Sequence, residues 1–248
     1  MARHGYREIA DEIRSLIDSG ALPPGSKVLG ENEIMAQYGV EQPTARRALD
    51  VLKNEGLIVA RRGSGTYVRE FRPIRRVSPD RLNKTVWGSD RSIWSATDNR
   101  RLSVTDVRVS KESAPPHIAH VLALTPEEQV IVRRRRYVVE EQSIQLATTY
   151  YPAALVKDSA IAEADTGVGG AYARLKDLGH EPVHFREELR TRMPRADEVK
   201  ALQLVQGTPV IEIMRTAYTE ANVPVELNEM VLDSSSYVLE YKFSAHSN

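Results

Sequence analysis

Apolar positions near the N-terminus follow the spacing of an amphipathic helix. Within residues 6–19, Ile9, Ile13 and Leu16 recur at intervals of four and three residues, which places them on one helix face. Gly20 and the prolines that follow it cannot continue the helix. The pattern therefore predicts a first helix that ends at about Gly20.

Two more helices and a β-hairpin are predicted in the residues that follow. A short helix spans 31–38, and after a tight turn another begins at Pro43, a residue tolerated in the first turn of a helix. Its inner face consists of small and apolar residues: Ala45, Ala48, Leu49 and Leu52. Gly56 closes it as a left-handed cap. The strands 57–61 and 66–68 then flank a glycine-rich turn at 62–65. This order of elements is typical of a winged helix-turn-helix.

The remainder of the chain alternates strand-like with helical segments. The predicted strands are 103–110, 129–140, 144–151, 209–217, 223–232 and 238–243, and the predicted helices are 114–122, 170–178 and 195–204. Such a run of strands with helices on one side favours an α+β fold with a mostly antiparallel sheet. Residues 70–92 are polar and aperiodic, which suggests a linker. We therefore expect a DNA-binding domain at 1–69, the linker at 70–92, and a second domain at 93–248.

Charge is divided unevenly along the chain. The 248 residues contain 34 Lys and Arg against 34 Asp and Glu, yet residues 42–76 hold nine basic and three acidic residues. A local excess of six positive charges suits a polyanion, because clustered Lys and Arg release counterions from phosphates. Arg46 and Arg47 face solvent near the start of the third helix, where arginine can read guanine in the major groove.

Composition narrows the classes of protein. No apolar run approaches the ~20 residues of a membrane span, and no signal-peptide core is present, so we expect a cytoplasmic protein without a membrane partner. The absence of cysteine excludes disulfides and thiolate chemistry. The histidine pairs His117/His120 and His180/His184 have no third ligand at a suitable spacing. We predict no cofactor, no metal and no enzymatic activity.

The N-terminal residues resemble the DNA-binding domain of the GntR family of bacterial transcription regulators. The stretches that carry the resemblance are 17–25, 38–40, 46–52, 55–58 and 61–68. It implies DNA contacts from the start of the second helix, the start of the third helix and the tip of the hairpin. The implied residues are Glu31, Asn32, Gln42, Pro43, Thr44, Arg46, Arg47, Arg62, Gly63, Ser64 and Gly65.

Two positions depart from the pattern of the family. Asn32 stands where the family commonly has a phosphate-contacting arginine, and Gln42 replaces a second arginine. Glutamine can pair with adenine through two hydrogen bonds, so Gln42 changes the expected base preference. We expect an operator that differs from the commonest one of the family.

The C-terminal segments resemble the UTRA ligand-sensing domain of the HutC-like subfamily, whose fold is similar to chorismate lyase. The resemblance rests on 130–137, 146–152, 207–213 and 236–241. It implies an effector pocket that draws on Trp94, Ser95, Arg133, Arg135, Gly169, Gly170, Glu226 and Tyr237. Gly169 and Gly170 precede a helix, where free N–H groups can receive an anion.

The run Arg133 to Arg136 allows two interpretations. On a strand these arginines alternate between two faces, and two cations facing the interior need negative partners. The partner is either an anionic group of an effector or an internal carboxylate such as Glu226 or Glu229.

Two functions from different classes remain open. One is a homodimeric, sequence-specific repressor that a small-molecule effector releases from a pseudo-palindromic operator. The alternative is a ligand-independent DNA-binding control protein of a plasmid or conjugative element, in which the C-terminal domain only dimerises.

Overall fold

The computed structural model describes residues 4–61, 63–83 and 102–243. The chain divides into two compact units. The N-terminal unit comprises Met1–Arg72 together with Leu204–Thr208, and the C-terminal unit comprises Pro73–Gln203 and Pro209–Asn248.

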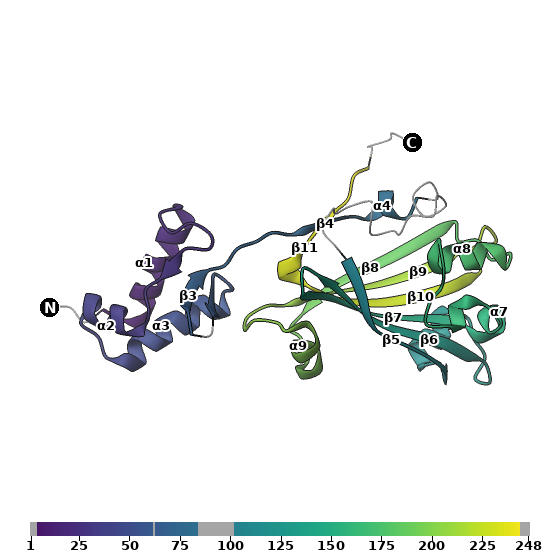
Figure 1. The fold of residues 1–248 in the computed structure, drawn as a ribbon, viewed down its shortest axis with the longest axis horizontal. Coiled ribbons are helices and arrows are strands. Elements are labelled where there is room, and N and C mark those ends of the chain that lie inside the picture. Colours follow the sequence, from purple (N-terminus) through teal and green to yellow (C-terminus); the bar gives the residue numbers. More distant parts are fainter. Residues whose placement is uncertain (1–3, 62, 84–101, 244–248) are drawn as a thin grey trace. The chain divides into compact units, whose positions relative to one another are not determined.

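The N-terminal unit has the predicted winged helix-turn-helix order (Figure 1). Its elements are α1 (Tyr6–Asp18), β1 (Lys27–Val28), α2 (Glu31–Tyr38), α3 (Gln42–Asn54), β2 (Ile58–Arg61) and β3 (Gly65–Val68). The strands form an antiparallel sheet in the order β1-β3-β2. Gly39, with φ 62°, ends α2 and begins the turn to α3.

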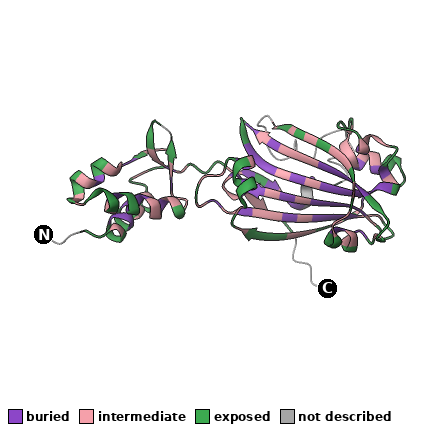
Figure 2. Cartoon of the chain, turned by 90° about the horizontal axis from the view of Figure 1, so that it is seen from below, coloured by how far each residue is buried: buried purple, intermediate pink, exposed green. Residues whose placement is uncertain are grey.

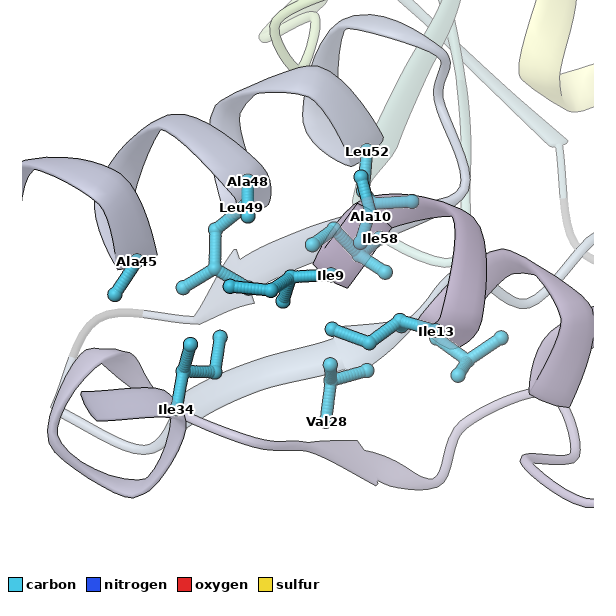
Figure 3. Close-up of a cluster of buried hydrophobic side chains, with 11 residues drawn as sticks. Ile9, Ala10, Ile13, Val28, Ile34, Ala45, Ala48, Leu49, Leu52 and Ile58 are labelled. Atoms are coloured by element: carbon cyan, nitrogen blue, oxygen red, sulfur yellow. The ribbon is translucent and has the colours of Figure 1, made fainter. Parts of the chain in front are cut away.

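The core of this unit is apolar (Figure 3). Ile9 and Ile13 of α1 meet Ile34 of α2 and the inner face of α3. Ala45 and Ala48 are completely buried, and their small side chains let the helices approach closely. The extent of the first helix and the inner face of the third are therefore as predicted, whereas Leu16, which was expected on the inner face of the first helix, is exposed.

The C-terminal unit is built on a six-stranded sheet in which every neighbouring pair is antiparallel. In spatial order its strands are β5 (Leu102–Ser113), β6 (Gln129–Val139), β7 (Gln142–Pro152), β10 (Pro224–Asp233), β9 (Val210–Tyr218) and β8 (His184–Arg192). The expected α+β fold with a mostly antiparallel sheet is confirmed.

Helices cover both faces of this sheet rather than the single face expected. They are α6 (Pro116–Val121), α7 (Ala153–Val156), α8 (Gly170–Asp177) and α9 (Ala196–Leu202), with short 3₁₀ turns at Ala160–Ala162 and Ser234–Ser236. Tyr150 packs with Ile118 of α6, whereas the next residue, Tyr151, packs with Tyr172 of α8. Successive side chains of a strand point to opposite faces, so α6 and α8 lie on different sides.

Part of the segment expected to be a linker has regular structure. β4 (Ile74–Val77) pairs in parallel with β11 (Tyr237–Glu240), and α4 (Ser78–Arg81) follows β4 directly. Ile74 and Tyr237 pack against the same face of the sheet as Tyr151 does, through Ala147 and Ile213. The polar composition of this segment concealed the strand, because Arg76 is buried by pairing with a carboxylate and not by apolar packing.

Strand β8 was also missed in the sequence. It lies at the edge of the sheet and leaves much of its length exposed, so it has no clean alternation of apolar and polar residues. The inner strands β7 and β10 show far more buried positions (Figure 2). Edge strands commonly carry charge, which protects them from pairing with other chains.

Candidate DNA-binding surface and effector site

The N-terminal half of α3 presents polar side chains to solvent. Gln42, Pro43, Arg46 and Arg47 are exposed, and Thr44 is partly buried. The opposite face of the helix carries the buried alanines of the core, so helical periodicity fixes which residues face outward. This surface can enter a groove of DNA without disturbing the core.

One of these arginines is held by an aromatic ring. The guanidinium of Arg47 lies 4.2 Å from the centre of the Tyr6 ring on α1, which is a cation–π contact. Arg46 is exposed beside it on the same helix. The two adjacent arginines therefore differ in how firmly their side chains are positioned.

The two residues at the starts of α2 and α3 contact each other. Gln42 Nε2 donates a hydrogen bond to Glu31 Oε2 at 2.9 Å. Asn32 is exposed next to Glu31. The structure thus brings together Glu31 and Gln42, two residues that the family resemblance implies at the DNA. The hydrogen bond orients the amide of Gln42, which stands where the family commonly has an arginine.

The hairpin tip is a turn with glycines in the left-handed region. Gly63 has φ 72° and Gly65 has φ 121°, conformations that favour glycine. The side chain of Ser64 is hydrogen-bonded to Tyr67 Oη at 2.7 Å, and Arg61 lies 4.7 Å from the centre of the same tyrosine ring. Arg62, which the resemblance also implies, lies outside the described residues.

In the C-terminal unit, a row of polar side chains crosses one face of the sheet. Strand register aligns five residues from five neighbouring strands, which we call the polar row: Glu187, Arg215, Asn228, Thr149 and Arg133. All except Glu187 are among the buried residues of the chain. The row lies between two apolar clusters, one around Tyr151 and Ala217 and the other around Ala147 and Ile213.

Arg133 is buried, with a relative exposure of 2%, but neither Glu226 nor Glu229 holds it. Its guanidinium donates to the backbone carbonyls of Ile161 (2.6 Å), Ala164 (2.9 Å) and Glu163. Burial lowers the pKa of Arg133. Of the two interpretations, pairing of this arginine with Glu226 or Glu229 is therefore wrong. Its side chain holds the loop that follows the 3₁₀ turn Ala160–Ala162.

Arg135, on the same face, donates to the hydroxyl of Thr149. The other two arginines of the run point to the opposite face, as alternation requires. Arg134 pairs with Glu112 (2.7 Å) and Arg136 with Asp106 (2.6 Å). The hydrogen bond from Arg134 lowers the pKa of Glu112 to about 2.

Glu226 is the centre of a buried hydrogen-bond network. It accepts hydrogen bonds from Tyr151 Oη (2.8 Å), Tyr172 Oη (2.9 Å) and Arg215 (3.2 Å). Burial, together with the negative charge of Glu226, raises the pKa of both tyrosine hydroxyls well above the ordinary value. The partner of Glu226 is therefore Arg215 and not Arg133 or Arg135.

Glu229, the other carboxylate considered for Arg133 and Arg135, is hydrogen-bonded to His117 (3.0 Å) and Tyr150 (3.2 Å). Pairing of either arginine with Glu229 is accordingly wrong as well.

The remaining predicted effector residues are distributed around the sheet. Tyr237 is buried and donates to Gln145 at 3.3 Å, and Gly169 precedes α8, which begins at Gly170. Trp94 and Ser95 lie outside the described residues.

Four charged residues beside this site were not singled out in the sequence: Arg76, Arg81, Glu187 and Arg215. Arg76 and Glu187 form a bidentate ion pair with one N–O distance of 2.9 Å. Burial opposes ionisation of Glu187, but the hydrogen bonds from Arg76 lower its pKa to about 2. Arg81 of α4 is buried as well. Only Arg215 could have been noticed in the sequence, because it is the one charged residue in the second half of the predicted strand 209–217.

A cavity of about 670 Å³ adjoins the ion pair. Its walls include Ser78, Glu187, Phe185 and Tyr241. Ser78 and Glu187 both accept hydrogen bonds from Arg76, which is itself buried and lies behind this wall.

Within the described ranges, no group of three or more histidine, aspartate or glutamate residues is placed to hold a metal ion. Nor does any helix in the part of the chain that the structure describes have the length and apolar character to cross a membrane.

Comparison with known proteins agrees with both halves of the architecture. The pattern of the family described as "Bacterial regulatory proteins, gntR family" matches residues 5–68, and that of the UTRA domain matches 98–238. An HTH-type transcriptional regulator of Streptomyces coelicolor is 30% identical over 96% of this chain and 92% of its own. The Escherichia coli mannosyl-D-glycerate transport/metabolism system repressor MngR is 25% identical over 94% of this chain and 92% of its own.

Solved structures show the same fold. The crystal structure of a GntR-family transcriptional regulator superposes with a TM-score of 0.67 at 26% identity, covering 97% of this chain and 98% of that one. PhnF from Mycobacterium smegmatis shares the fold with a TM-score of 0.60 at 21% identity, covering 96% of this chain and all (100%) of that one. The chain belongs to the GntR family of bacterial transcription regulators, with a DNA-binding helix-turn-helix domain followed by a UTRA domain.

Proposed function

We propose that this regulator is a homodimeric repressor, which binds a pseudo-palindromic operator and releases it when the UTRA domain takes a small-molecule effector. One observation carries the DNA-reading part of the proposal. The outward face of α3 offers Gln42, Arg46 and Arg47 to a groove, while Ala45 and Ala48 anchor the opposite face. The same geometry supports Glu31, Asn32 and the hairpin tip as flanking contacts.

Dimerisation follows from the amount of sequence that one helix can read. A single recognition helix contacts only a few base pairs, and a two-fold symmetric protein doubles the site. The half-sites are then separated by about 10 base pairs or a multiple of that distance. A protein that acts on bacterial operators works in the cytoplasm.

The relative MngR is a repressor, which supports the same role for this chain. Release requires the effector to bind more tightly to the conformation that does not fit the operator. Shifting the population from mostly bound to mostly free takes about 5 kcal/mol of differential affinity. Groups inside the C-terminal unit therefore have to contact the effector strongly.

The test is a footprint of the purified protein on the DNA upstream of its own gene, with light scattering to determine the oligomeric state. We expect protection of a two-fold symmetric site that resists random competitor DNA, and a particle of twice 27.8 kDa. A monomer, or the absence of protection at low salt, would contradict the proposal.

The ligand-independent alternative has a separate outcome. If no compound in a metabolite screen both raises the melting temperature and weakens operator binding, the C-terminal domain serves dimerisation alone. The DNA-binding part of the proposal would survive that result, and the effector part would not.

A further inference from the structure

Both flanks of the polar face of α3 are held by a neighbouring helix. Gln42, at one flank, donates its 2.9 Å hydrogen bond to Glu31 of α2. Arg47, at the other flank, lies over the ring of Tyr6 of α1, with its guanidinium carbon 4.2 Å from the ring centre. Helical periodicity places Arg46 between the flanks, where it makes no hydrogen bond or ion pair within the described part of the chain. The reading face thus has two oriented side chains and a free one.

Tyr6 is suited to hold another side chain because its own ring is fixed. It is partly buried and packs against the apolar core that contains Ile9 and Ile34. Its hydroxyl accepts a hydrogen bond of 3.1 Å from Nε of Arg7. The ring is thus fastened to α1 and to the core, whereas the arginine that lies over it, Arg47, comes from a different helix.

The charges around the ring agree with this contact. The hydrogen bond from Arg7 lowers the pKa of the Tyr6 hydroxyl, burial opposes this shift, and the positive charge of Arg47 adds to it. A cation over an aromatic face is attracted by the quadrupole of the ring. Asp50, three residues after Arg47 on α3, pairs with Lys53 at 3.1 Å. This carboxylate therefore does not draw Arg47 away from the ring.

The contact with the ring leaves the hydrogen-bonding groups of Arg47 free. A guanidinium carries its five N–H donors in its own plane, so a ring that covers its face uses none of them. Among the residues that the structure describes, none accepts a hydrogen bond from these donors. Arg47 therefore keeps the pair of N–H groups that recognises the O6 and N7 atoms of guanine.

A fixed orientation matters more for reading a base than for contacting a phosphate. The edge of guanine accepts two hydrogen bonds from an arginine only when the guanidinium fork is aligned with it, whereas a phosphate can be contacted from many directions. A free arginine also loses rotamer freedom when it binds, and orienting it beforehand reduces that cost. A ring that orients Arg47 therefore favours base recognition by this residue.

We propose that Tyr6 is a positioning residue of the DNA-binding surface, which holds Arg47 over its ring in the orientation that reads a guanine in each half-site. The inference rests on the proposed operator binding and adds α1 to the elements that determine the sequence preference. Tyr6 is not among the residues that the family resemblance implies at the DNA.

The test uses variants that separate the aromatic face of Tyr6 from its packing. Tyr6→Leu and Tyr6→Met fill the same part of the core without an aromatic face, and Tyr6→Phe keeps the face but loses the hydroxyl. The matched control is Tyr38→Leu. Tyr38 is also partly buried against this core, but its ring meets His4, at 5.6 Å between ring centres, and no arginine within the described residues. Melting temperatures report any loss of stability, and binding is measured where every full-length variant is folded.

The measurement is fluorescence anisotropy with the footprinted operator, with duplexes that have one base pair changed in both half-sites, and with a random duplex. Wild type should prefer guanine at one position, and Arg47→Ala should lower that preference about 5- to 150-fold, the range for a bidentate pair of arginine and guanine. Tyr6→Leu and Tyr6→Met should lower the same preference about 2- to 5-fold, the range for an exposed cation–π contact. Tyr6→Phe and Tyr38→Leu should retain it.

A double variant shows whether Tyr6 acts through Arg47. Tyr6→Leu combined with Arg47→Ala should bind every duplex like Arg47→Ala alone, because no guanidinium is left to orient. Losses that add in the double variant would overturn the proposal. A loss of preference in Tyr6→Phe or Tyr38→Leu as large as in Tyr6→Leu would also overturn it, since the hydroxyl or the packing would then be responsible.

The random duplex separates positioning from a general role in folding or phosphate binding. Tyr6→Leu should bind it with almost the affinity of wild type, and equal losses on operator and random DNA would refute the inference. If wild type distinguishes none of the duplexes, the operator binding on which the inference rests fails together with it. If wild type shows a preference that Tyr6→Leu and Tyr6→Met both retain, the inference alone fails.

Discussion

The two units of the molecule differ in where their charged side chains lie. The core of the N-terminal unit is made of isoleucine, leucine, valine and alanine, and its arginines lie at the surface or against aromatic rings. Every buried charged side chain among the described residues belongs to the C-terminal unit: Arg76, Arg81, Arg133, Glu198, Arg215, Glu226 and Asp233. The same chain therefore contains an apolar core and a core divided by a polar band.

The difference reflects what each unit has to bind. DNA is large and is met at a surface, where exposed arginines attract phosphates without any change in the interior. A small ligand that is enclosed has to find its polar partners inside the protein, and those partners must be held in place while the site is empty. The network around Glu226 does this by satisfying three buried donors at once.

The largest predicted effect comes from a substitution that breaks this network. Glu226→Ala leaves the Arg215 cation and the hydroxyls of Tyr151 and Tyr172 buried without their acceptor, so the free energy of unfolding of the C-terminal unit should fall by about 3–5 kcal/mol. Hydrogen exchange of the full-length protein, followed by peptide, assigns the loss to β7, β9 and β10. The control is Glu212→Ala, whose half-exposed pair with Arg192 at 2.7 Å contributes about 0–1 kcal/mol. Equal losses in the two variants would contradict the role of the network.

The second largest predicted effect is the loss of stability of the C-terminal unit in acid. The pKa of Glu187 in the folded protein is lowered to about 2, against an ordinary value of 4.5. A lowered folded pKa adds stability that is fully present above the unfolded pKa and is lost as the pH falls toward 2. The C-terminal unit should thus lose stability between about pH 5 and pH 2, and Glu187→Gln should flatten that part of its profile. A profile that the substitution leaves unchanged would show that other carboxylates govern the acid response.

The N-terminal unit was largely predictable from the sequence because its elements obey local rules. Ile9 and Ile13 recur at helical spacing, Pro43 and Gly56 mark the ends of a helix, and the glycines of the hairpin mark its turn. Its core forms when each helix turns its apolar face inward. Both the elements and the exposed face of α3 could therefore be derived without knowledge of distant contacts.

The polar band of the C-terminal unit was not predictable in the same way. Alternation placed Arg133 and Arg135 on one face, but the partners of Arg133 are carbonyls of residues 161–164, about thirty positions away. The pairing of Arg215 with Glu226 depends on the register between β9 and β10. The pairing of Arg76 with Glu187 joins β4 and β8, two strands that were not predicted because their composition is polar. Long-range register is a property of the fold and not of any local window.

A third prediction concerns the surface that reads DNA. Arg46→Ala should weaken operator binding by about 1–3 kcal/mol and relax specificity at one base pair, with little change in binding to random DNA. Arg61→Ala, on the hairpin, should weaken both kinds of DNA similarly and reduce the salt dependence, as a phosphate contact does. Fluorescence anisotropy with operator and random duplexes at several salt concentrations distinguishes these outcomes. Equal losses on both duplexes for Arg46→Ala would exclude it as a base reader.

The smallest predicted effect concerns the hydrogen bond from Gln42 Nε2 to Glu31 Oε2, 2.9 Å long. This bond uses one of the two amide hydrogens of Gln42 and leaves the other hydrogen and Oε1 for the donor and acceptor of an adenine edge. Glu31→Ala should therefore change the stability of this exposed site by less than about 0.5 kcal/mol. It should lower the preference for adenine at one operator position by less than about 1 kcal/mol, because the amide can then rotate.

Binding to four operators that differ only at that base pair measures the preference. Gln42→Arg provides the contrast, since an arginine there should transfer the preference to guanine. If all four operators weaken equally in Glu31→Ala, the hydrogen bond does not orient the amide for reading. The exposed face of α3 would then select its operator through Arg46 and Arg47, and the departure at Gln42 would change the affinity for DNA without changing the sequence preference.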